Sequence, residues 1–427
     1  MPRLFLTLVA CAAAMLSAIG CNQSAPPEFR FNAVELRKQE MQHLGEGEKF
    51  DAKYKSEIGN LVTSLFGTPD DPEFPFLMGE DDPAQDIIKM DYLKMAAGAV
   101  NSDKAGPTVG LYREHCAHCH GITGDGAGAT ASTLNPYPRD FRLGKFKFKS
   151  TPLRTPPTDH DLKNILVRGV PGTAMPSFRT LEDDELDSLV HYVKYLTMRG
   201  MYERYLIGEL AGLEEGQSLV DFSLIASKDG EEPSDDAIEE FEEQLYTFIG
   251  EGYQEGIMDR WLDPDRKITE IPPAPAEVDP SHPDHDKLVA QGGKLFFSKG
   301  NCAQCHGDTG VGDGQLANFD DWTKEWTNSP GVDPFDKATY KDFVKLGAMD
   351  PRPIRPRNLN QGIYRGGDRP DDVYLRIANG IEGTPMPASA AMNSDEIWAL
   401  VAYVRSIPFE AEVDQNSKVI NTQQVAR

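Results

Sequence analysis

Two segments of this 427-residue chain carry apolar residues at the spacing of one helix face. The stripe in the first segment consists of Leu186, Leu189, Val190, Val193 and Leu196. The stripe in the second consists of Ile397, Leu400, Val401 and Val404. Each stripe predicts an amphipathic helix whose apolar side packs on a core. Polar pairs that suit a helix start stand before the stripes, Thr180 with Asp183 and Asn393 with Glu396.

Two shorter segments are predicted as helices that cross the striped ones. They cover residues around 107–116 and 286–301. Each contains a glycine near aromatic residues, Gly110 in the first and Gly292 or Gly293 in the second. A glycine at such a position lets a crossing helix approach closely. The pattern as a whole predicts a mainly α protein with long loops.

Four blocks of sequence occur twice in the same order, which is the mark of a duplicated unit. The block "VGLYREHCAHCHGITGDGAG" at 109–128 is similar to "GKLFFSKGNCAQCHGDTGVGDG" at 293–314. In the same way "YPRDFRLGKF" matches "RPRNLNQGIY", and "LVRGVPGTAMPSF" matches "RIANGIEGTPMPAS". The two striped segments close the series. The chain therefore contains two copies of one helical domain.

The repeats divide the chain into segments, as expected for a length that exceeds one ordinary core. The predicted order is a signal peptide at 1–20, an N-terminal extension of tether and helices at 21–105, a first domain at 106–200, an acidic linker at 201–285, a second domain at 286–410 and a disordered tail at 411–427. The second domain differs from the first by an insertion at 315–354 that carries Trp322 and Trp326.

Charge is concentrated in the acidic linker, which holds 23 acidic and 5 basic residues. The formal net charge of the chain is −25, so a polyanion would be repelled, and nucleic acid is excluded as a partner. A helix is predicted to start near Ser234, with Ile238, Phe241, Leu245 and Phe248 on one face. The acidic run is either a solvated surface or a docking patch for a basic partner.

The N-terminus is typical of an exported protein. Arg3 precedes an apolar run of about 16 residues, which is short for a membrane-spanning helix of roughly 20. The run ends in "LSAIGC", which looks like the lipobox at which lipoprotein signals are cut before a lipidated cysteine, here Cys21. Acyl chains on Cys21 would hold the protein at a membrane surface outside the cytoplasm. The alternatives are a plain secretory signal with a chance cysteine and a retained membrane anchor.

Each repeat contains C-x-x-C-H, formed by Cys116, Cys119 and His120 in the first and by Cys302, Cys305 and His306 in the second. This pattern indicates covalent attachment of haem c, because two thiols at that spacing reach the haem vinyl groups and the histidine then lies under the iron. The chain is thus predicted to hold two covalent haem c groups. The competing interpretation is one Zn²⁺ bound by both cysteine pairs. It leaves the histidines and the glycine-rich stretches beyond them unexplained.

A methionine loop follows each haem motif. Met175 in "GTAMPSF" and Met386 in "GTPMPAS" stand before a proline and ahead of the striped helix. A thioether sulfur suits haem iron, and its ligation together with histidine raises the reduction potential. We therefore predict that His120 and Met175 ligate one iron, and that His306 and Met386 ligate the other. Met349 and Met392 are the competitors of Met386.

Both repeats resemble class I cytochrome c domains, which have an early C-x-x-C-H motif, a G-T-x-M-P loop and a terminal helix that crosses the first. The resemblance covers residues 106–200 and 286–410. It implies a small helical fold around a largely buried haem with one edge exposed for electron transfer. The insertion has no counterpart in that family, and it either covers the haem edge or binds a partner.

Several polar residues near the motifs have open roles. Arg139 and Arg357 occupy matching positions and either pair with haem propionates or are simply exposed. The basic stretch from Arg139 to Arg154, which includes Lys145, Lys147 and Lys149, serves the same purpose or faces an acidic partner. His115 and His118 are predicted bystanders, since their repeat partners are an asparagine and a glutamine.

The predicted function is electron transfer by a membrane-tethered dihaem cytochrome c outside the cytoplasm. With both axial positions filled, neither iron has room for substrate, so a carrier is expected and no enzyme. Analogy with the family places the protein between a quinol-oxidising complex or a dehydrogenase and a terminal oxidase. The alternatives are a dihaem peroxidase, which needs one open iron, and the electron-accepting haem subunit of a periplasmic dehydrogenase.

Overall fold

The computed structural model describes residues 27–45, 47–76, 82–103, 106–214, 216–225, 233–262 and 268–410. The predicted signal peptide, Cys21 and the tail at 411–427 lie outside these ranges. The described chain is mainly helical, as predicted, and its only sheet is an antiparallel pair of strands in which Val100 pairs with Val109. Within the same ranges, no helix is both long enough and apolar enough to cross a membrane.

The N-terminal extension is a set of helices that pack around the first domain. Its elements are α2 (Ala33–His43), α3 (Lys53–Phe66), α4 (Ala84–Ile87), α5 (Met90–Ala96) and strand β1 (Val100–Asp103). Strand β2 (Gly106–Val109) leads into the first domain. The apolar face of α3 is buried, with Ile58 and Phe66 fully enclosed. The extension therefore shares one core with the first domain.

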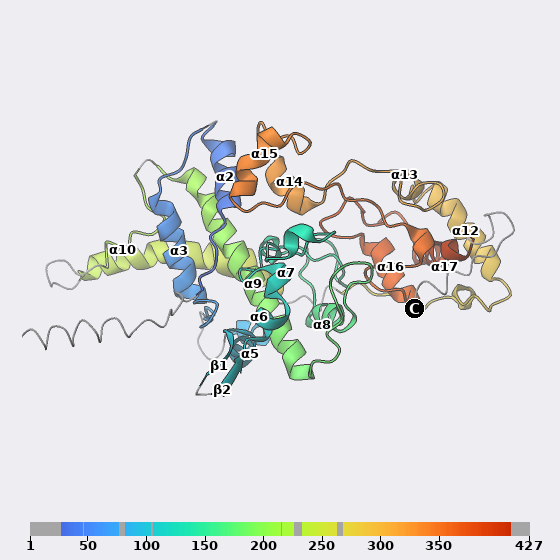
Figure 1. The fold of residues 1–427 in the computed structure, drawn as a ribbon, viewed down its shortest axis with the longest axis horizontal. Helices are drawn as coiled ribbons and strands as arrows, with labels where there is room; N and C mark the ends of the chain where they lie inside the picture. Colours follow the sequence, from blue (N-terminus) through green and yellow to red (C-terminus); the bar gives the residue numbers. More distant parts are fainter. Residues whose placement is uncertain are drawn as a thin grey trace, which may run out of the picture.

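The first domain is built on one long helix, α9 (Asp183–Glu209), which crosses the centre of the molecule in Figure 1. Its other helices are α6 (Leu111–His115), α7 (Ala117–His120) and α8 (Asp159–Arg168), with short 3₁₀ turns at Ala131–Thr133 and Phe141–Leu143. The predicted stripe of α9 packs inward, and Leu189 and Leu196 are fully buried. The helix continues past residue 200, so its last turns belong to the sequence predicted as linker.

The acidic linker is partly helical, as expected. A 3₁₀ turn (Leu210–Gly212) follows α9, and then come α10 (Asp235–Tyr246), a π-helical segment (Thr247–Met258), α11 (Asp259–Trp261) and a 3₁₀ turn (Ala276–Val278). Ser234 caps α10 by accepting a hydrogen bond from the Ala237 backbone, which confirms the predicted start. Phe241 and Leu245 pack against the first core, and Ile238 is exposed.

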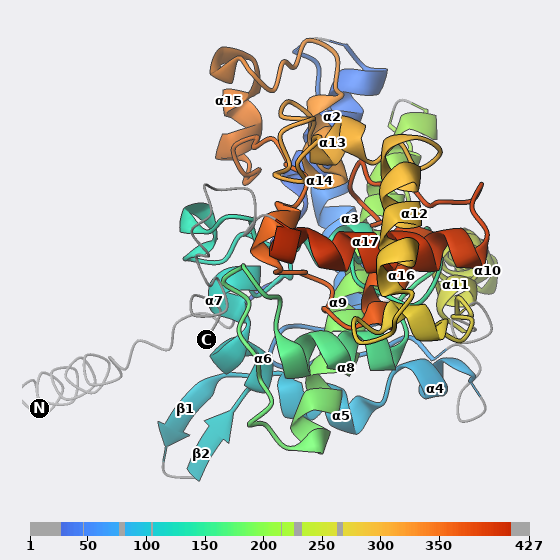
Figure 2. The same cartoon turned by 90° about the vertical axis from the view of Figure 1, so that its right-hand side faces the viewer.

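The second domain has the smaller core; it lies to the right of the first in Figure 1 and faces the viewer in Figure 2. It contains α12 (His285–Phe297), α13 (Ala303–His306), a 3₁₀ turn (Leu359–Gln361), α16 (Pro370–Asn379) and α17 (Ser394–Glu410). Helix α12 crosses α17 at Gly292, where a Cβ would lie 2.0 Å from the Ala399 carbonyl oxygen. This contact confirms the close approach that the glycine predicts. Asn393 and Glu396 form the predicted capping box, with both hydrogen bonds at 3.0 Å.

Two local predictions for the first domain are wrong. Residues 107–116 do not form one helix, because strand β2 precedes α6 and the crossing helix on α9 is α5 of the N-terminal extension. Accordingly, Gly110 packs on the Gly98 backbone instead of on α9. Helix α9 begins after Glu182, whose backbone N–H donates to the Glu185 carboxylate at 2.9 Å, so Thr180 is not the cap.

The insertion forms two helices, α14 (Asp321–Thr327) and α15 (Lys337–Lys345). They lie beside α2 at the top of Figure 1. Their buried aromatic residues Trp326, Tyr340 and Phe343 form a separate small core with Val34 and Met41 of α2. The two segments without a counterpart in the cytochrome c pattern thus pack against each other.

Candidate haem sites

Both C-x-x-C-H motifs form one tight helical turn. In the first, the His120 backbone N–H donates to the Cys116 carbonyl at 2.9 Å, and in the second His306 donates to Cys302 at 2.8 Å. The four cysteines of the motifs are free thiols. Burial raises the pKa of Cys116 to about 12 and that of Cys302 to about 11, so both carry a proton. The turn thus presents two thiols and a histidine on one short stretch of backbone.

The glycine-rich stretch after each histidine folds back over the motif. Gly126 donates to the His120 carbonyl at 2.9 Å, and Gly312 donates to that of His306 at 2.8 Å. Gly126 has φ +71° and a Cβ there would lie 2.8 Å from the Pro138 carbonyl oxygen. Gly312, with φ +83°, is enclosed in the same way by the Pro356 carbonyl. Only glycine fits these two positions, which explains why the stretch follows both motifs.

Each motif histidine has one ring nitrogen engaged and the other free to bind a metal. Nδ1 of His120 lies 3.0 Å from the Arg139 carbonyl oxygen, and Nδ1 of His306 lies 3.2 Å from that of Arg357. A carbonyl partner fixes the proton on Nδ1 and leaves Nε2 as a metal ligand. Burial lowers the pKa of His120 to about 4 and lowers that of His306, so both rings are neutral at pH 7. Phe141 stacks on the His120 ring at 4.8 Å.

The two methionine loops have the same hydrogen bonds. The Met175 backbone N–H donates to the Thr173 hydroxyl at 3.1 Å, and its carbonyl accepts from Val170 at 3.1 Å. Met386 repeats both bonds with Thr384 at 3.2 Å and Ile381 at 3.1 Å. Both methionine side chains are half-buried. The loops therefore hold their methionines in matched, fixed positions.

The competitors of Met386 occupy other environments. Met392 packs against the second core, and its terminal methyl lies near Gly300. It stands directly before the cap residue Asn393, where a residue that staples the helix start is expected. Met349 follows the last helix of the insertion. Neither lies in a loop that repeats the hydrogen bonds around Met175, so Met386 stays the predicted ligand.

Arg139 and Arg357 lie at the boundary of the two domains. The Arg139 guanidinium stacks on the Trp322 ring, with 3.5 Å from Cζ to the ring centroid. Arg357 donates from Nε to the Ile363 carbonyl at 2.9 Å and from Nη2 to the Gln361 side chain at 2.9 Å. In the described part of the chain, neither arginine forms an ion pair with a carboxylate. The carboxylates of Asp320, Asp140 and Glu382 interact with Arg139 only at longer range.

Two further cations lie close to these arginines: Lys147, which belongs to the basic stretch noted in the sequence, and Arg365, which no sequence pattern singles out. Lys147 lies 5.1 Å from the Trp322 ring, and burial together with Arg139 lowers its pKa to about 7. Arg365 has a buried Nε without a hydrogen-bond partner, and burial and Arg357 lower its pKa. Lys147 pairs with Asp320 at 3.8 Å. No carboxylate among the described residues forms an ion pair with Arg139, Arg357 or Arg365, and partly buried cations of this kind require anions. The two propionates of each haem are such anions, so these residues fit the cofactor.

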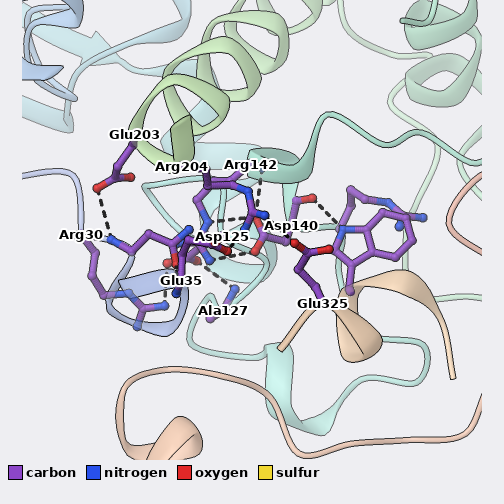
Figure 3. A network of polar contacts seen from close by, with 12 residues as sticks. Arg30, Glu35, Asp125, Ala127, Asp140, Arg142, Glu203, Arg204 and Glu325 are labelled. Carbon is purple, nitrogen blue, oxygen red and sulfur yellow. Dashed lines mark hydrogen bonds and ion pairs between the residues drawn. The ribbon is translucent and has the colours of Figure 1, made fainter. Parts of the chain in front are cut away.

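A polar network ties the first haem loop to the rest of the molecule (Figure 3). Arg30 of the N-terminal extension pairs with Asp125 of the glycine-rich stretch at 2.6 Å. Arg204 of α9 pairs with Glu35 of α2 at 2.5 Å and with Glu325 of the insertion at 2.6 Å. The first haem site is thus braced by segments that are distant in sequence.

The cysteine motifs also raise the question of a bare zinc site, and the first motif has two other histidines in or beside it, His115 and His118. Among the residues that the structure describes, no group of three or more histidine, cysteine, aspartate or glutamate side chains is placed to hold a bare metal ion. The His118 side chain is exposed, and the His115 ring lies 5.8 Å from that of Phe178. Their assignment as bystanders stays a prediction.

Comparison with known families agrees with this site. Residues 105–193 match the family model described as cytochrome C oxidase, cbb3-type, subunit III, and residues 289–408 match the model described as cytochrome c. Two cytochrome c domains of this kind support a dihaem c-type cytochrome. They imply two covalently bound c-type haems with iron, and they indicate an electron carrier.

The chain was also compared with individual proteins. Among solved structures, the chain is similar to a chain of the reducing HAO-like protein complex of Kuenenia stuttgartiensis. The identity is 24% over 70% of this chain and 93% of that chain, with a TM-score of 0.44. No curated protein matches the chain.

Proposed function

We propose that this protein is a membrane-tethered dihaem cytochrome c that relays single electrons in a respiratory chain outside the cytoplasm. The observation that carries the proposal is the duplication of a complete site: each domain holds two free thiols, a histidine with Nδ1 engaged, and a methionine in an identically bonded loop. The donor and acceptor would be a quinol-oxidising complex or a dehydrogenase on one side and a terminal oxidase on the other.

The haem groups supply the one-electron chemistry, because iron alternates between the ferrous and ferric states. The chain's own residues hold and tune them. The four motif cysteines would anchor the groups covalently, and His120 and His306 would offer Nε2 to the iron because Nδ1 donates to a carbonyl. Met175 and Met386 would supply the second iron ligand of each site from loops with matched hydrogen bonds. Arg139 and Arg357, with Lys147 and Arg365, would face the propionates.

Two enzyme-related functions remain as alternatives. A dihaem peroxidase needs one iron with an open position, and the matched methionine loops favour the carrier instead. An electron-accepting subunit of a periplasmic dehydrogenase would use the same two sites, with the catalytic centre on another chain. Peroxide turnover with a high-spin haem signal would support the peroxidase, and stable co-purification with a dehydrogenase would support the subunit.

Optical redox titration of the purified protein tests the proposal. We expect two low-spin haems, each with the sulfur-to-iron absorption band of methionine ligation. Met175→Ala should abolish that band for one haem and leave the other unchanged, because the second domain keeps its own methionine. Met392→Ala is the matched control and should leave both bands intact. Loss of both bands, or of neither, in the Met175 variant contradicts the ligand assignment.

The tether is tested separately. Cys21→Ala should move the protein from the membrane fraction to the soluble fraction of the compartment outside the cytoplasm, because several acyl chains would be lost. The haem spectra should be unchanged. A Cys21 variant that stays with the membrane would contradict the lipid anchor.

A further inference from the structure

Trp322 of the insertion lies against the first haem site. Its indole Nε1 donates to the Asp140 carbonyl at 3.0 Å, and its ring stacks on the guanidinium of Arg139 at 3.5 Å. The Arg139 carbonyl is the group that engages Nδ1 of His120. Trp322 therefore contacts the backbone stretch that orients the iron-binding histidine of the first domain.

The other side of the same indole lies against the second haem site. A Cβ on Gly383 would lie 2.3 Å from Trp322 Cζ3, so the ring fits only because this residue is glycine. Gly383 stands three positions before Met386 in the loop that presents the predicted ligand. The neighbouring Asp321 backbone N–H donates to the Gly383 carbonyl at 3.0 Å. One side chain thus touches the histidine side of one site and the methionine loop of the other.

The equivalent contact on the other side of the interface is made by an arginine and not by a tryptophan. Gly172 occupies the same place in the Met175 loop as Gly383 in the Met386 loop. A Cβ on Gly172 would lie 3.1 Å from the Arg357 guanidinium, so there the arginine itself reaches the opposing methionine loop. Arg139 is the repeat partner of Arg357, and it reaches Gly383 through Trp322 instead. The two arginines therefore reach the opposing methionine loops in corresponding ways, Arg357 directly and Arg139 through the indole of the insertion.

The helix that carries Trp322 is held firmly in this position. Lys145 of the first domain pairs with Asp321 at 2.8 Å, and Lys147 pairs with Asp320 at 3.8 Å. At the other end of α14, Glu325 pairs with Arg204 of α9. Clamped at both ends, α14 has little freedom to move the indole out of the interface.

We propose that Trp322 couples the two haem sites into one electron-transfer unit, its indole forming the packed contact across which an electron passes between them. One ferrous iron becomes ferric and one ferric iron becomes ferrous; no proton moves and no bond changes. This inference rests on the proposed relay function. It assigns the insertion the role of joining the haem sites, in contrast to binding a partner.

The test is the rate of electron exchange between the haems within one molecule. Exchange spectroscopy by proton NMR on the half-reduced protein follows the shifted haem methyl signals, and the part of the rate that is independent of protein concentration is intramolecular. Trp322→Leu should slow this part at least several-fold, because it opens a gap between Arg139 and Gly383. Trp322→Phe keeps a ring and should keep most of the rate.

Trp326→Phe is the matched control, since Trp326 lies on the same helix but packs on Phe343 in the core of the insertion, at 5.1 Å between ring centroids. It should leave the rate unchanged. If Trp322→Leu does not fold, Trp322→Met fills the volume without a ring and gives the same test. An unchanged rate in the ring-less variant, or equal slowing in the Trp326 control, overturns the inference. If either haem lacks the methionine band or is not reduced, the relay function fails instead.

Discussion

The two haem domains share their sites and differ in what surrounds them. The motif turns, the glycine stretches and the methionine loops repeat with the same hydrogen bonds within a few tenths of an ångström. Of the surrounding helices, α8 and α9 have counterparts in α16 and α17, whereas the helix that packs across α9 or α17 and the size of the core differ. The core of the first domain extends from Tyr54 of α3 to Trp261 of the linker, whereas the core of the second runs from Val278 to Ile407 with far fewer residues.

The crossing helix shows the difference most clearly. In the second domain α12 ends a short turn before the motif and crosses α17 itself. In the first domain that role falls to α5, and a two-stranded hairpin stands between α5 and the motif. Both copies therefore keep the backbone geometry of the haem motif, while the crossing helix packed near that motif differs between them. A site fixed by local hydrogen bonds tolerates a different core beneath it.

The largest expected difference between the two domains is the loss of folded structure when each is deprived of its haem. Cys302→Ala with Cys305→Ala removes the covalent anchors of the second domain. Its small core then lacks the cofactor, so we expect α12, α16 and α17 to unfold. Cys116→Ala with Cys119→Ala should leave most of the first domain folded, because α3, α5 and α9 share a large core of their own.

Far-ultraviolet circular dichroism measures the loss of helix in the two variants. The fluorescence of Trp398, which is only 1% exposed on α17, reports on the second domain. A haem stain after denaturing electrophoresis confirms that one haem remains in each variant. Equal loss of helix in both variants would show that the larger core gives no independent stability.

The repeated parts of the molecule were predictable because their signals are local. A C-x-x-C-H spacing, a glycine stretch or the pair Asn393 and Glu396 specifies its own backbone within a few residues. The structure bears out the second capping box and the apolar faces of α9 and α17. These features give the helical fold and locate both haem turns.

The unrepeated parts were not predictable because they depend on contacts between distant residues. Nothing near residue 90 indicates that α5 replaces a helix expected at 107–116, since its place is set by packing on α9. The cap of α9 was missed because Glu182 is an unusual residue before a helix. The sequence identifies Trp322 only as an aromatic residue in an insertion. Its contacts with Arg139 and Gly383 depend on how the two domains pack together.

The smallest expected effect concerns the contact that joins the unrepeated segments. Glu325 of α14 pairs with Arg204 of α9 and with Lys38 of α2, at 2.6 and 2.9 Å. Burial raises the pKa of Glu325, but the attraction of Arg204 and Lys38 outweighs it and lowers that pKa from 4.5 to about 2. The stability that Glu325 contributes is therefore fully present above about pH 4.5 and is lost as the pH falls toward 2.

Glu325→Gln removes the charge and should destabilise the insertion against α2 by about 1–3 kcal/mol at pH 7. Because the wild type itself loses this contribution in acid, the gap between the two proteins in thermal unfolding should narrow as the pH falls below about 4.5. Asp342→Asn is the matched control on α15, since its pair with Lys345 at 2.8 Å is exposed and contributes little at any pH. A constant gap between wild type and the Glu325 variant across this range would mean that the carboxylate does not join the two segments. The insertion would then be held by its aromatic core and by the contacts of Trp322 with the two haem domains.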